Sequence, residues 1–410
     1  MPTTLSTPAL YNLAPLAPML LAGLALALAP LAWVSWRHRQ GSRAGKVQAL
    51  TLLTLFLTFD LVLFGAFTRL TDSGLGCPDW PGCYGSASPS GADMSIQAAQ
   101  TALPDGPVTQ RKAWIEMIHR YLATGVGALI LLLAVFAWTI GRTSIGRPGR
   151  GSTAAEGASL YELRWWALAT LVWVCIQGAF GALTVTMKLF PAIVTLHLLG
   201  GLVLLALLTV QVARAGRKGT HAALSNPGRG DLPLPKATTW LLWLGFGALA
   251  VQVALGGWVS TNYAVLACSD FPRCQGSFWP SMDFSQGFEF WRPLGRTAGG
   301  DHIAFAALTA IHFTHRMFAL VVLVVLGVLA WQLSRHPVLR KAAHGLAGLL
   351  GLQAATGLAN VVLGWPLLAA VLHTGGAAAL VVVLTWVACQ APARKASTGS
   401  SARIDWGVAA

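Results

Sequence analysis

Two short stretches place a histidine directly before an arginine inside a long apolar segment. Residues 116–120 read Glu-Met-Ile-His-Arg, and residues 312–316 read His-Phe-Thr-His-Arg. Each half of the chain has a further histidine in a later apolar run, His197 in the first half and His373 in the second. An imidazole in hydrocarbon is costly and marks a functional site by default. Pairs of histidines on facing helices are also how bundles hold a haem between axial ligands.

The four predicted ligands are His119, His197, His315 and His373. A single histidine inside a membrane is more often a packing or hydrogen-bonding residue than a metal ligand. Counting inward from the next basic loop, however, puts all four at similar depth, near one edge of a hydrocarbon core about 30 Å thick. Matched depth in two pairs favours axial ligation of two haems. A zinc site is disfavoured because no cysteine or carboxylate cluster would complete a tetrahedron.

Composition identifies the elements that must carry these residues. Of 410 residues, 55% are hydrophobic and only 10% are charged, whereas soluble proteins carry about 25% charged residues. The chain is therefore expected to be an all-α polytopic membrane protein. The net charge of +14 does not indicate nucleic-acid binding, because Lys and Arg gather in short loops between apolar runs, as cytoplasmic loops do.

Nine apolar runs predict nine membrane helices. They lie near 13–36, 47–68, 114–140, 165–186, 192–213, 238–259, 304–333, 342–363 and 367–389. The first lacks the basic leader of a signal peptide and is followed by the dense basic run 37–46. The basic loops 141–164, 214–236 and 334–341, with the basic C-terminal tail, then fall on one side. This charge pattern places the N-terminus outside and the C-terminus in the cytoplasm.

The same topology puts two long loops outside, 69–113 and 260–303. Each loop contains a pair of cysteines separated by five residues, Cys77 with Cys83 and Cys268 with Cys274. In a cytosolic protein metal binding would be considered, but a loop in an oxidising compartment permits a disulfide.

The two loops differ in composition. The Gly, Ser, Ala and Pro content between Gly85 and Pro107 predicts irregular structure. An aromatic cluster over 278–291 in the second loop suits either the membrane interface or the cover of a flat apolar ligand.

An internal repeat relates the halves. Both cysteine pairs, and Gly65 with Gly256, are separated by 191 positions; His119 and His315 by 196; His197 and His373 by 176. Separations that change only across loops indicate duplication. Units of four helices keep the same orientation, which is a parallel repeat.

The predicted architecture is two parallel-repeat four-helix bundles with one extra N-terminal transmembrane helix. The expected divisions are an extra helix and basic loop (1–46), the N-terminal four-helix unit (47–214), a cytoplasmic linker (215–236), the C-terminal four-helix unit (237–390) and a cytoplasmic tail (391–410).

Charged residues beside the histidines suggest further roles. Arg120 and Arg316 would either pair with haem propionates or merely anchor helix ends. Three residues before the ligand, the first half has Glu116 where the second has His312, so the first unit is predicted to be the reactive one, with the carboxylate moving protons. Asp60 is a further candidate for a buried carboxylate.

Taken together, these motifs resemble the haem A synthase family, of the bacterial type with cysteine pairs. The resemblance covers roughly residues 47–390 and includes the stretch Thr-Arg-Leu-Thr-Asp-Ser-Gly-Leu-Gly-Cys-Pro-Asp-Trp-Pro-Gly-Cys over 68–83, the E-x-x-H-R helix and the two units with four histidines. It implies an oxidoreductase that converts the C8 methyl of haem O to a formyl group by successive hydroxylations, giving haem A for terminal oxidases. The family pattern has eight helices, so the leading helix departs from it.

By position, the resemblance assigns His119 and His197 to the substrate haem, His315 and His373 to a haem B cofactor, and Glu116 to catalysis. It also implies the disulfides Cys77–Cys83 and Cys268–Cys274. The implied location is the bacterial inner membrane, and the implied partners are a haem O synthase and an electron donor, since the chain has no flavin or nicotinamide fingerprint. The resemblance leaves open whether the chain forms a homo-oligomer.

Two other classes compete with this interpretation. A dihaem b-type cytochrome that passes electrons from quinol to an acceptor would explain the histidines but not Glu116. A transporter would explain the repeat but not the matched histidines.

Overall fold

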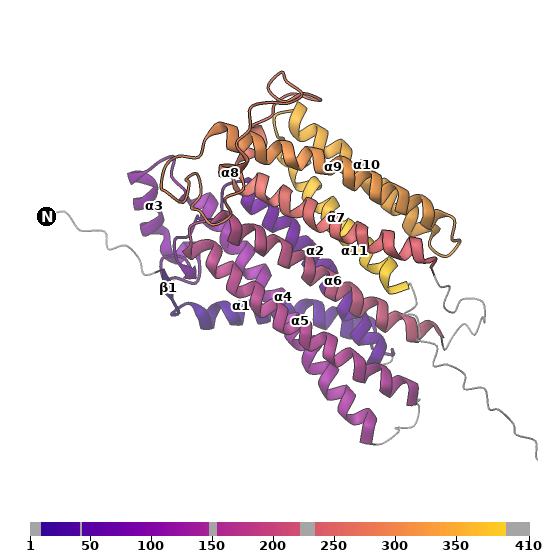
Figure 1. The fold of residues 1–410 in the computed structure, drawn as a ribbon. Coiled ribbons are helices and arrows are strands. Elements are labelled where there is room, and N and C mark those ends of the chain that lie inside the picture. Colours follow the sequence, from indigo (N-terminus) through magenta and orange to yellow (C-terminus); the bar gives the residue numbers. More distant parts are fainter. Residues whose placement is uncertain (1–9, 42, 147–153, 222–233, 391–410) are drawn as a thin grey trace, which may run out of the picture.

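The computed structural model describes residues 10–41, 43–146, 154–221 and 234–390. The predicted C-terminal tail, most of the linker 215–236, and the basic residues Arg147 and Arg150 lie outside these ranges. Within them the chain is a bundle of long helices that run side by side, with loops gathered at both ends (Figure 1).

All nine predicted membrane helices are present within the described residues. They are α1 (Leu16–Arg37), α2 (Arg43–Leu70), α4 (Gln110–Gly146), α5 (Ala154–Thr186), α6 (Pro191–His221), α7 (Lys236–Thr261), α9 (Phe305–Ser334), α10 (Arg340–Val362) and α11 (Leu367–Gln390). Each contains a stretch long and apolar enough to cross a membrane. The prediction of an all-α polytopic membrane protein is confirmed.

Polar residues inside these helices bond to their own backbone, as hydrocarbon requires. On α2, the hydroxyls of Thr51, Thr54 and Thr58 each donate to the carbonyl four residues earlier, at 2.7–2.8 Å. A threonine bonded in this way satisfies its hydroxyl hydrogen within its own helix. The helix thus tolerates a buried threonine stripe.

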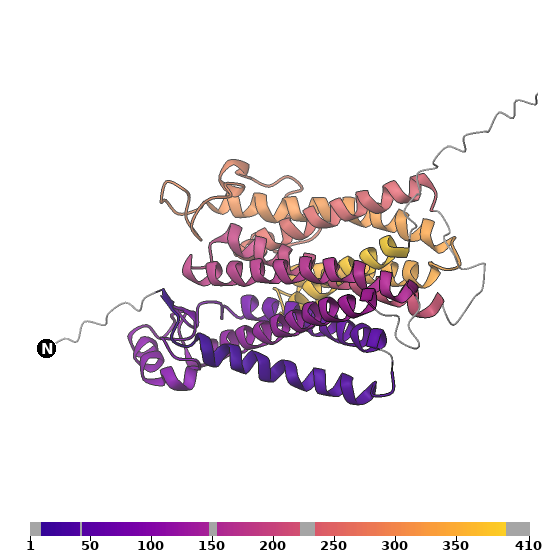
Figure 2. The same ribbon diagram turned by 90° about the horizontal axis from the view of Figure 1, so that it is seen from below.

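The eight membrane-spanning helices described after α1 form two rings of four. In the first ring α2, α4, α5 and α6 each pack against two neighbours, and in the second α7, α9, α10 and α11 do the same. The histidine-bearing helices of each ring, α4 with α6 and α9 with α11, therefore lie across the ring from one another. Figure 2 shows the two halves of the chain side by side.

The rings meet through α2, α6, α7 and α11, and equivalent residues face each other there. Arg69 donates to the carbonyl of Ser260, and its guanidinium lies 4.1 Å from the ring centre of Tyr263. The Tyr263 hydroxyl donates to Asp72 at 2.6 Å. Both contacting pairs are separated by the repeat distance of 191 residues, so the rings are related by an approximate twofold axis.

The N-terminal segment covers the first disulfide loop. β1 (Tyr11–Asn12) pairs in parallel with β2 (Trp80–Pro81), and the Tyr11 hydroxyl lies 3.0 Å from that of Thr186. α1 then packs along α4, where Gly23 contacts Thr124 so closely that a Cβ would lie 2.9 Å from its backbone carbon. The extra helix is thus an integral side of the first unit.

The loop between Gly85 and Pro107 is partly helical, which corrects the prediction of irregular structure. It contains η1 (Pro89–Ala92) and α3 (Asp93–Ala102). Asp93 accepts hydrogen bonds from Gln97 at 2.7 Å and from Gln110 at 2.8 Å. These side-chain bonds organise small residues that composition alone assigns to a loop.

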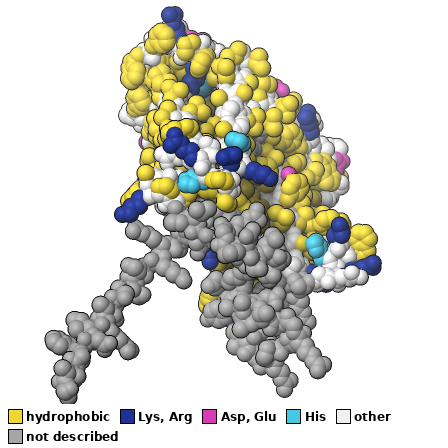
Figure 3. Space-filling view, turned by 90° about the vertical axis from the view of Figure 1, so that its right-hand side faces the viewer, with side chains coloured by type: hydrophobic (Ala, Val, Ile, Leu, Met, Phe, Trp, Pro, Cys, Tyr) yellow, Lys and Arg dark blue, Asp and Glu magenta, His cyan; other side chains and the backbone are white. Residues whose placement is uncertain are grey.

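The second outer loop has only η2 (Ala264–Leu266) and α8 (Phe284–Gly287). Five residues of its aromatic cluster are exposed: Phe278, Trp279, Phe284, Phe290 and Trp291. The opposite end of the molecule carries Lys, Arg and His side chains among apolar ones (Figure 3). The end of the bundle opposite the disulfide loops therefore also carries exposed basic residues, as a cytoplasmic face would.

Candidate haem sites and the disulfide loops

The four histidines lie in two equivalent pairs on helices across each ring. His119 on α4 and His197 on α6 are close enough to interact electrostatically. His315 on α9 and His373 on α11 have ring centres 6.5 Å apart and ring planes 80° apart. All four side chains are partly exposed. In each unit the predicted ligands are thus brought together across the ring.

Each histidine ring rests against a glycine of a neighbouring helix. A Cβ at Gly65 would lie 3.0 Å from the His119 ring, and one at Gly256 would lie 2.9 Å from the His315 ring. The same relation holds for Gly181 with His197 and Gly357 with His373, at 3.6 and 3.3 Å. Glycine at the two tighter positions admits the imidazole between packed helices.

The spacing of the second pair fits a haem. Two metal–nitrogen bonds of about 2.0 Å each, plus the distance from each nitrogen to its ring centre, roughly span the 6.5 Å between the ring centres of His315 and His373. Among the described residues no group of three or more His, Cys, Asp and Glu side chains is placed to hold a metal ion. A pair of histidines is one of the ligand sets that can hold a haem.

The two pairs differ in the partners of their ring nitrogens. Nδ1 of His373 lies 2.9 Å from the Thr356 hydroxyl, and Nδ1 of His315 lies 3.2 Å from the Gln252 amide. Nδ1 of His119 and Nδ1 of His197 are buried without a hydrogen-bond partner in the described structure. The His119 ring instead stacks on Phe64, with centres 6.2 Å apart.

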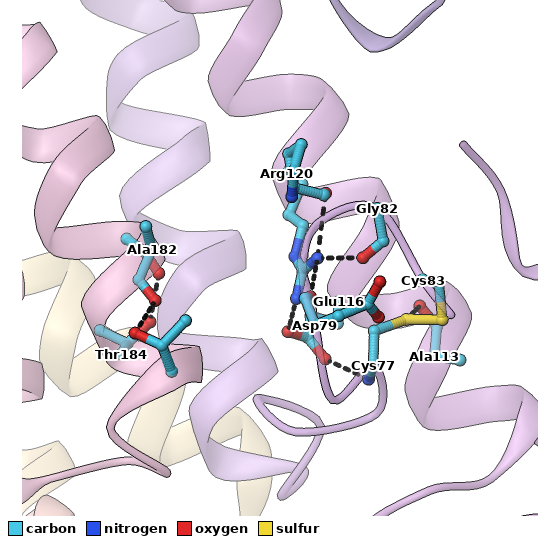
Figure 4. A network of polar contacts seen from close by, with 12 residues as sticks. Cys77, Asp79, Gly82, Cys83, Ala113, Glu116, Arg120, Ala182 and Thr184 are labelled. Carbon is cyan, nitrogen blue, oxygen red and sulfur yellow. Dashed lines mark hydrogen bonds and ion pairs between the residues drawn. A yellow bond between two sulfur atoms is a disulfide. The ribbon is translucent and has the colours of Figure 1, made fainter. Parts of the chain in front are cut away.

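Glu116 lies beside the first disulfide loop (Figure 4). Its side chain is buried; Oε1 accepts from Arg120 at 2.5 Å and Oε2 accepts from the backbone N–H of Cys77 at 2.8 Å. The loop disulfide Cys77–Cys83 is formed, and both cysteines are fully buried. One buried carboxylate thus connects the helix of His119 to the disulfide.

Arg120 also binds the first disulfide loop. Its guanidinium donates to the carbonyls of Asp79, Pro81 and Gly82 at 2.5–3.0 Å, as well as to Glu116 (Figure 4). These bonds engage the cation with protein groups, and the predicted pairing of Arg120 with a haem propionate stays a prediction.

The second loop repeats this arrangement without a carboxylate. Arg316 donates to the carbonyls of Cys268, Asp270 and Arg273 at 2.6–3.1 Å, and its Nε lies 3.3 Å from Nε2 of His312. The Cys268–Cys274 disulfide is also formed. His312 therefore replaces Glu116 as the neighbour of the arginine, and the propionate role of Arg316 likewise stays a prediction.

Two aspartates that the sequence analysis missed shape the loops. Asp79 accepts from the backbone N–H groups of Tyr84 and Gly85 at 2.6 and 2.7 Å, and Asp270 accepts from those of Gln275 and Gly276 at 2.7 and 2.9 Å.

These bonds support left-handed backbone at the residues that donate them, with φ of 48° and 73° in the first loop and 54° and 73° in the second. The pattern C-x-D-x-x-x-C-x-G occurs in both loops and could have identified the two aspartates from the sequence.

Asp60 is not buried, which corrects the sequence interpretation. Its side chain is exposed on the surface of α2, on the same stripe as the exposed Leu52 and Phe56. Hydropathy reports that a residue lies in a helix but not which way it faces. The candidate carboxylate of the first unit is therefore Glu116.

Comparison with known proteins agrees with this geometry. Residues 48–385 match the family model COX15-CtaA, described as cytochrome oxidase assembly protein. The chain is 36% identical over 335 residues to the haem A synthase of Shewanella oneidensis, covering 82% of this chain and 93% of that protein.

The chain belongs to the haem A synthase family.

More distant members include the haem A synthases of Erythrobacter litoralis, 27% identical over 352 residues, and of Halalkalibacterium halodurans, 25% identical over 318 residues. The first alignment covers 81% of this chain and 93% of the relative, and the second 76% and 86%. The family match begins after α1, so the extra helix lies outside the part of the chain that defines the haem A synthases.

Proposed function

We propose that this chain oxidises the C8 methyl of haem O to a formyl group by successive hydroxylations, producing haem A. The observation that carries the proposal is the pair of matched histidine sets in a haem A synthase fold, one beside a buried carboxylate and one without it. Related proteins named haem A synthase support the reaction, and the two unlike histidine sets support a division of labour.

The first unit, 47–214, would bind the substrate. His119 and His197 would hold haem O, next to the first disulfide loop. Glu116, held between Arg120 and the Cys77 N–H, would exchange protons through its carboxylate as the methyl group loses hydrogen. Burial of this carboxylate keeps bulk water from competing for those protons.

The second unit, 237–390, would hold haem B between His315 and His373. A haem B bound there would supply one-electron transfer between an external donor and the first unit. The chain's own residues orient the two rings and close the outer end with the second disulfide loop. Arg120 and Arg316 would fix these loops, and a propionate of each haem would lie within reach of the guanidinium that serves its unit.

The charge pattern supports a location in the bacterial inner membrane, with the N-terminus outside and the C-terminus in the cytoplasm. On this orientation both disulfide loops face the oxidising side. The external partners would be a haem O synthase that delivers substrate and a separate electron donor.

The experiment that tests the proposal is an inventory of extracted haems by chromatography and mass spectrometry. Full-length protein is purified from cells with and without a haem O synthase. Haem B together with haem O, its hydroxylated form or haem A is expected when haem O is supplied. Haem B alone under both conditions would instead indicate a dihaem electron carrier.

A further inference from the structure

The histidine pairs differ in a feature that the overall repeat does not explain: the second pair has polar partners at Nδ1 and the first pair does not. We propose that Gln252 and Thr356 are positioning residues that make His315 and His373 permanent ligands, and that their absence from the first unit leaves His119 and His197 able to release a haem. This inference rests on the proposed function, because it assumes that one haem is substrate and the other is cofactor.

The hydroxyl of Thr356 determines which nitrogen of His373 is free. Thr356 donates its only hydrogen to the carbonyl of Leu352 at 2.7 Å, so its oxygen faces Nδ1 of His373, 2.9 Å away, as an acceptor. Nδ1 must then carry the ring proton, and Nε2 keeps the lone pair that binds a metal. Gln353 donates to the backbone carbonyl of His373 at 2.8 Å, which holds the same turn of α11.

Gln252 is the polar neighbour of His315. Its amide nitrogen lies 3.2 Å from Nδ1 and donates to the backbone carbonyl of His315 at 3.3 Å. This bond holds the turn of α9 that carries the ring, as Gln353 holds the turn of α11 that carries His373. Both ligands of the second unit thus have a polar neighbour at Nδ1, and such partners orient a ligating imidazole.

The equivalent positions of the first unit are apolar. The separation of 191 residues relates Gln252 to Leu61, and the separation of 176 relates Thr356 to Phe180. Neither side chain can accept a hydrogen bond, which agrees with the buried, unpartnered Nδ1 atoms of His119 and His197.

A shift in register does not cause this difference. Gln177 lies against Gly200 in the first unit as Gln353 lies against Gly376 in the second, because a Cβ at either glycine would overlap the glutamine amide. The neighbouring positions of the repeat therefore superpose, and only the partners of the ligands have changed.

The difference between the two histidine pairs agrees with the proposed roles of the two haems. A substrate haem must bind and its product must leave at every turnover, whereas an electron-transfer haem must stay. Removing the hydrogen-bond partner of a metal ligand typically costs about 10–100-fold in metal affinity. The first unit would lack this contribution at both ligands, and the second would have it at both.

The test compares haem retention and redox potential in full-length protein loaded with haem B. Thr356→Val and Gln252→Met remove the polar partners at nearly constant volume, and Thr356→Ser restores the hydroxyl. The two apolar variants are expected to lose haem B to excess apomyoglobin about tenfold faster, and Thr356→Val is expected to raise the midpoint potential because His373 becomes a weaker donor. Thr356→Ser is expected to behave as the unchanged protein.

The reciprocal variant Leu61→Gln keeps the second unit intact and offers His119 the polar neighbour that Gln252 gives His315. It is expected to slow release of haem A from the first unit and to leave the haem B potential unchanged. If neither Thr356→Val nor Gln252→Met accumulates, Leu61→Gln alone tests the inference. Release of haem A at the unchanged rate would then overturn it.

The outcomes separate the inference from the proposed function. Unchanged protein that binds no haem B would contradict the proposed function itself. Unchanged protein that holds haem B, with apolar variants that retain it equally well at the same potential, would overturn the roles of Gln252 and Thr356 only.

Discussion

The two disulfide loops share the groups that shape them but differ in the side chain that contacts their arginine. In both, an arginine one residue after the predicted ligand binds loop carbonyls, and an aspartate two residues after the first cysteine caps the turn. In the first, the arginine pairs with buried Glu116 and a β-strand covers the loop; in the second it contacts His312 and aromatic side chains stay exposed. Duplication therefore kept the groups that build the loop and changed those that would meet a ligand.

The largest effect is expected where the loops differ most. Glu116→Gln keeps the size of the side chain but cannot exchange a proton, and its single amide oxygen can accept from only one of the two donors that Glu116 binds. We expect haem A formation to fall roughly 10²–10⁴-fold, measured as haem A per protein after growth with haem O. The matched variant His312→Gln should change the rate by less than about tenfold, and equal losses in both variants would remove the distinction between the units.

The two arginines should differ in stability. Arg120→Gln leaves Glu116 buried without its cation, which costs about 3–5 kcal/mol. Arg316→Gln removes hydrogen bonds to neutral groups and is expected to cost about 1–3 kcal/mol. Thermal unfolding in detergent followed by tryptophan fluorescence should therefore rank the Arg120 variant as the less stable, and the reverse order would show that the ion pair contributes little.

Several of these features were predictable from the sequence and others were not. The nine helices follow from apolar runs between basic loops, and both disulfides follow from paired spacing in loops on one side. The predicted histidine pairs are brought together because a helix fixes depth per residue.

The sequence does not report which side of its helix a residue occupies, and this explains the wrong or missing predictions for Asp60, Gln252 and Thr356. Asp60 lies in an apolar run, yet its helical face points outward, and hydropathy does not report facing. Gln252 and Thr356 are two of several polar residues in membrane helices, and only the neighbouring helix shows that they meet histidines. The strand at Tyr11–Asn12 is too short to leave a periodic signal.

The β1 strand should limit the access of reductant to the disulfide of the first loop. Without reductant, all four loop cysteines should resist alkylation, since both bonds are formed. With limiting reductant, Cys268 and Cys274 should be labelled several-fold faster, because β1 covers only the first loop. Mass spectrometry of labelled peptides measures this difference, and faster labelling of Cys77 and Cys83 would show that β1 does not protect its loop.

The smallest expected effect concerns the pH response of the second loop. The backbone N–H of Gly276, followed by that of Gln275, holds the pKa of Asp270 below its ordinary value of 3.8. A lowered pKa stabilises the folded loop above pH 3.8, and this stabilisation is lost as the pH falls through the lowered value. Asp270→Asn should therefore loosen the loop at pH 7 and have a smaller effect near pH 3.

Limited proteolysis of the outer loop with an acid-tolerant protease, compared between the two pH values, measures this response. Asp283→Asn is the control in the same loop, since the pKa of Asp283 is lowered chiefly by the Ser285 hydroxyl and not by the disulfide turn. An Asp270 effect of equal size at both pH values would assign the carboxylate a steric role.

The measurement that tests the division of labour most directly is the haem content of two matched variants, His197→Ala and His373→Ala, purified from cells that supply haem O. The account predicts that His197→Ala retains haem B and loses haem O and haem A, whereas His373→Ala loses haem B. Loss of the same haem from both variants, or retention of both haems by each, would contradict it.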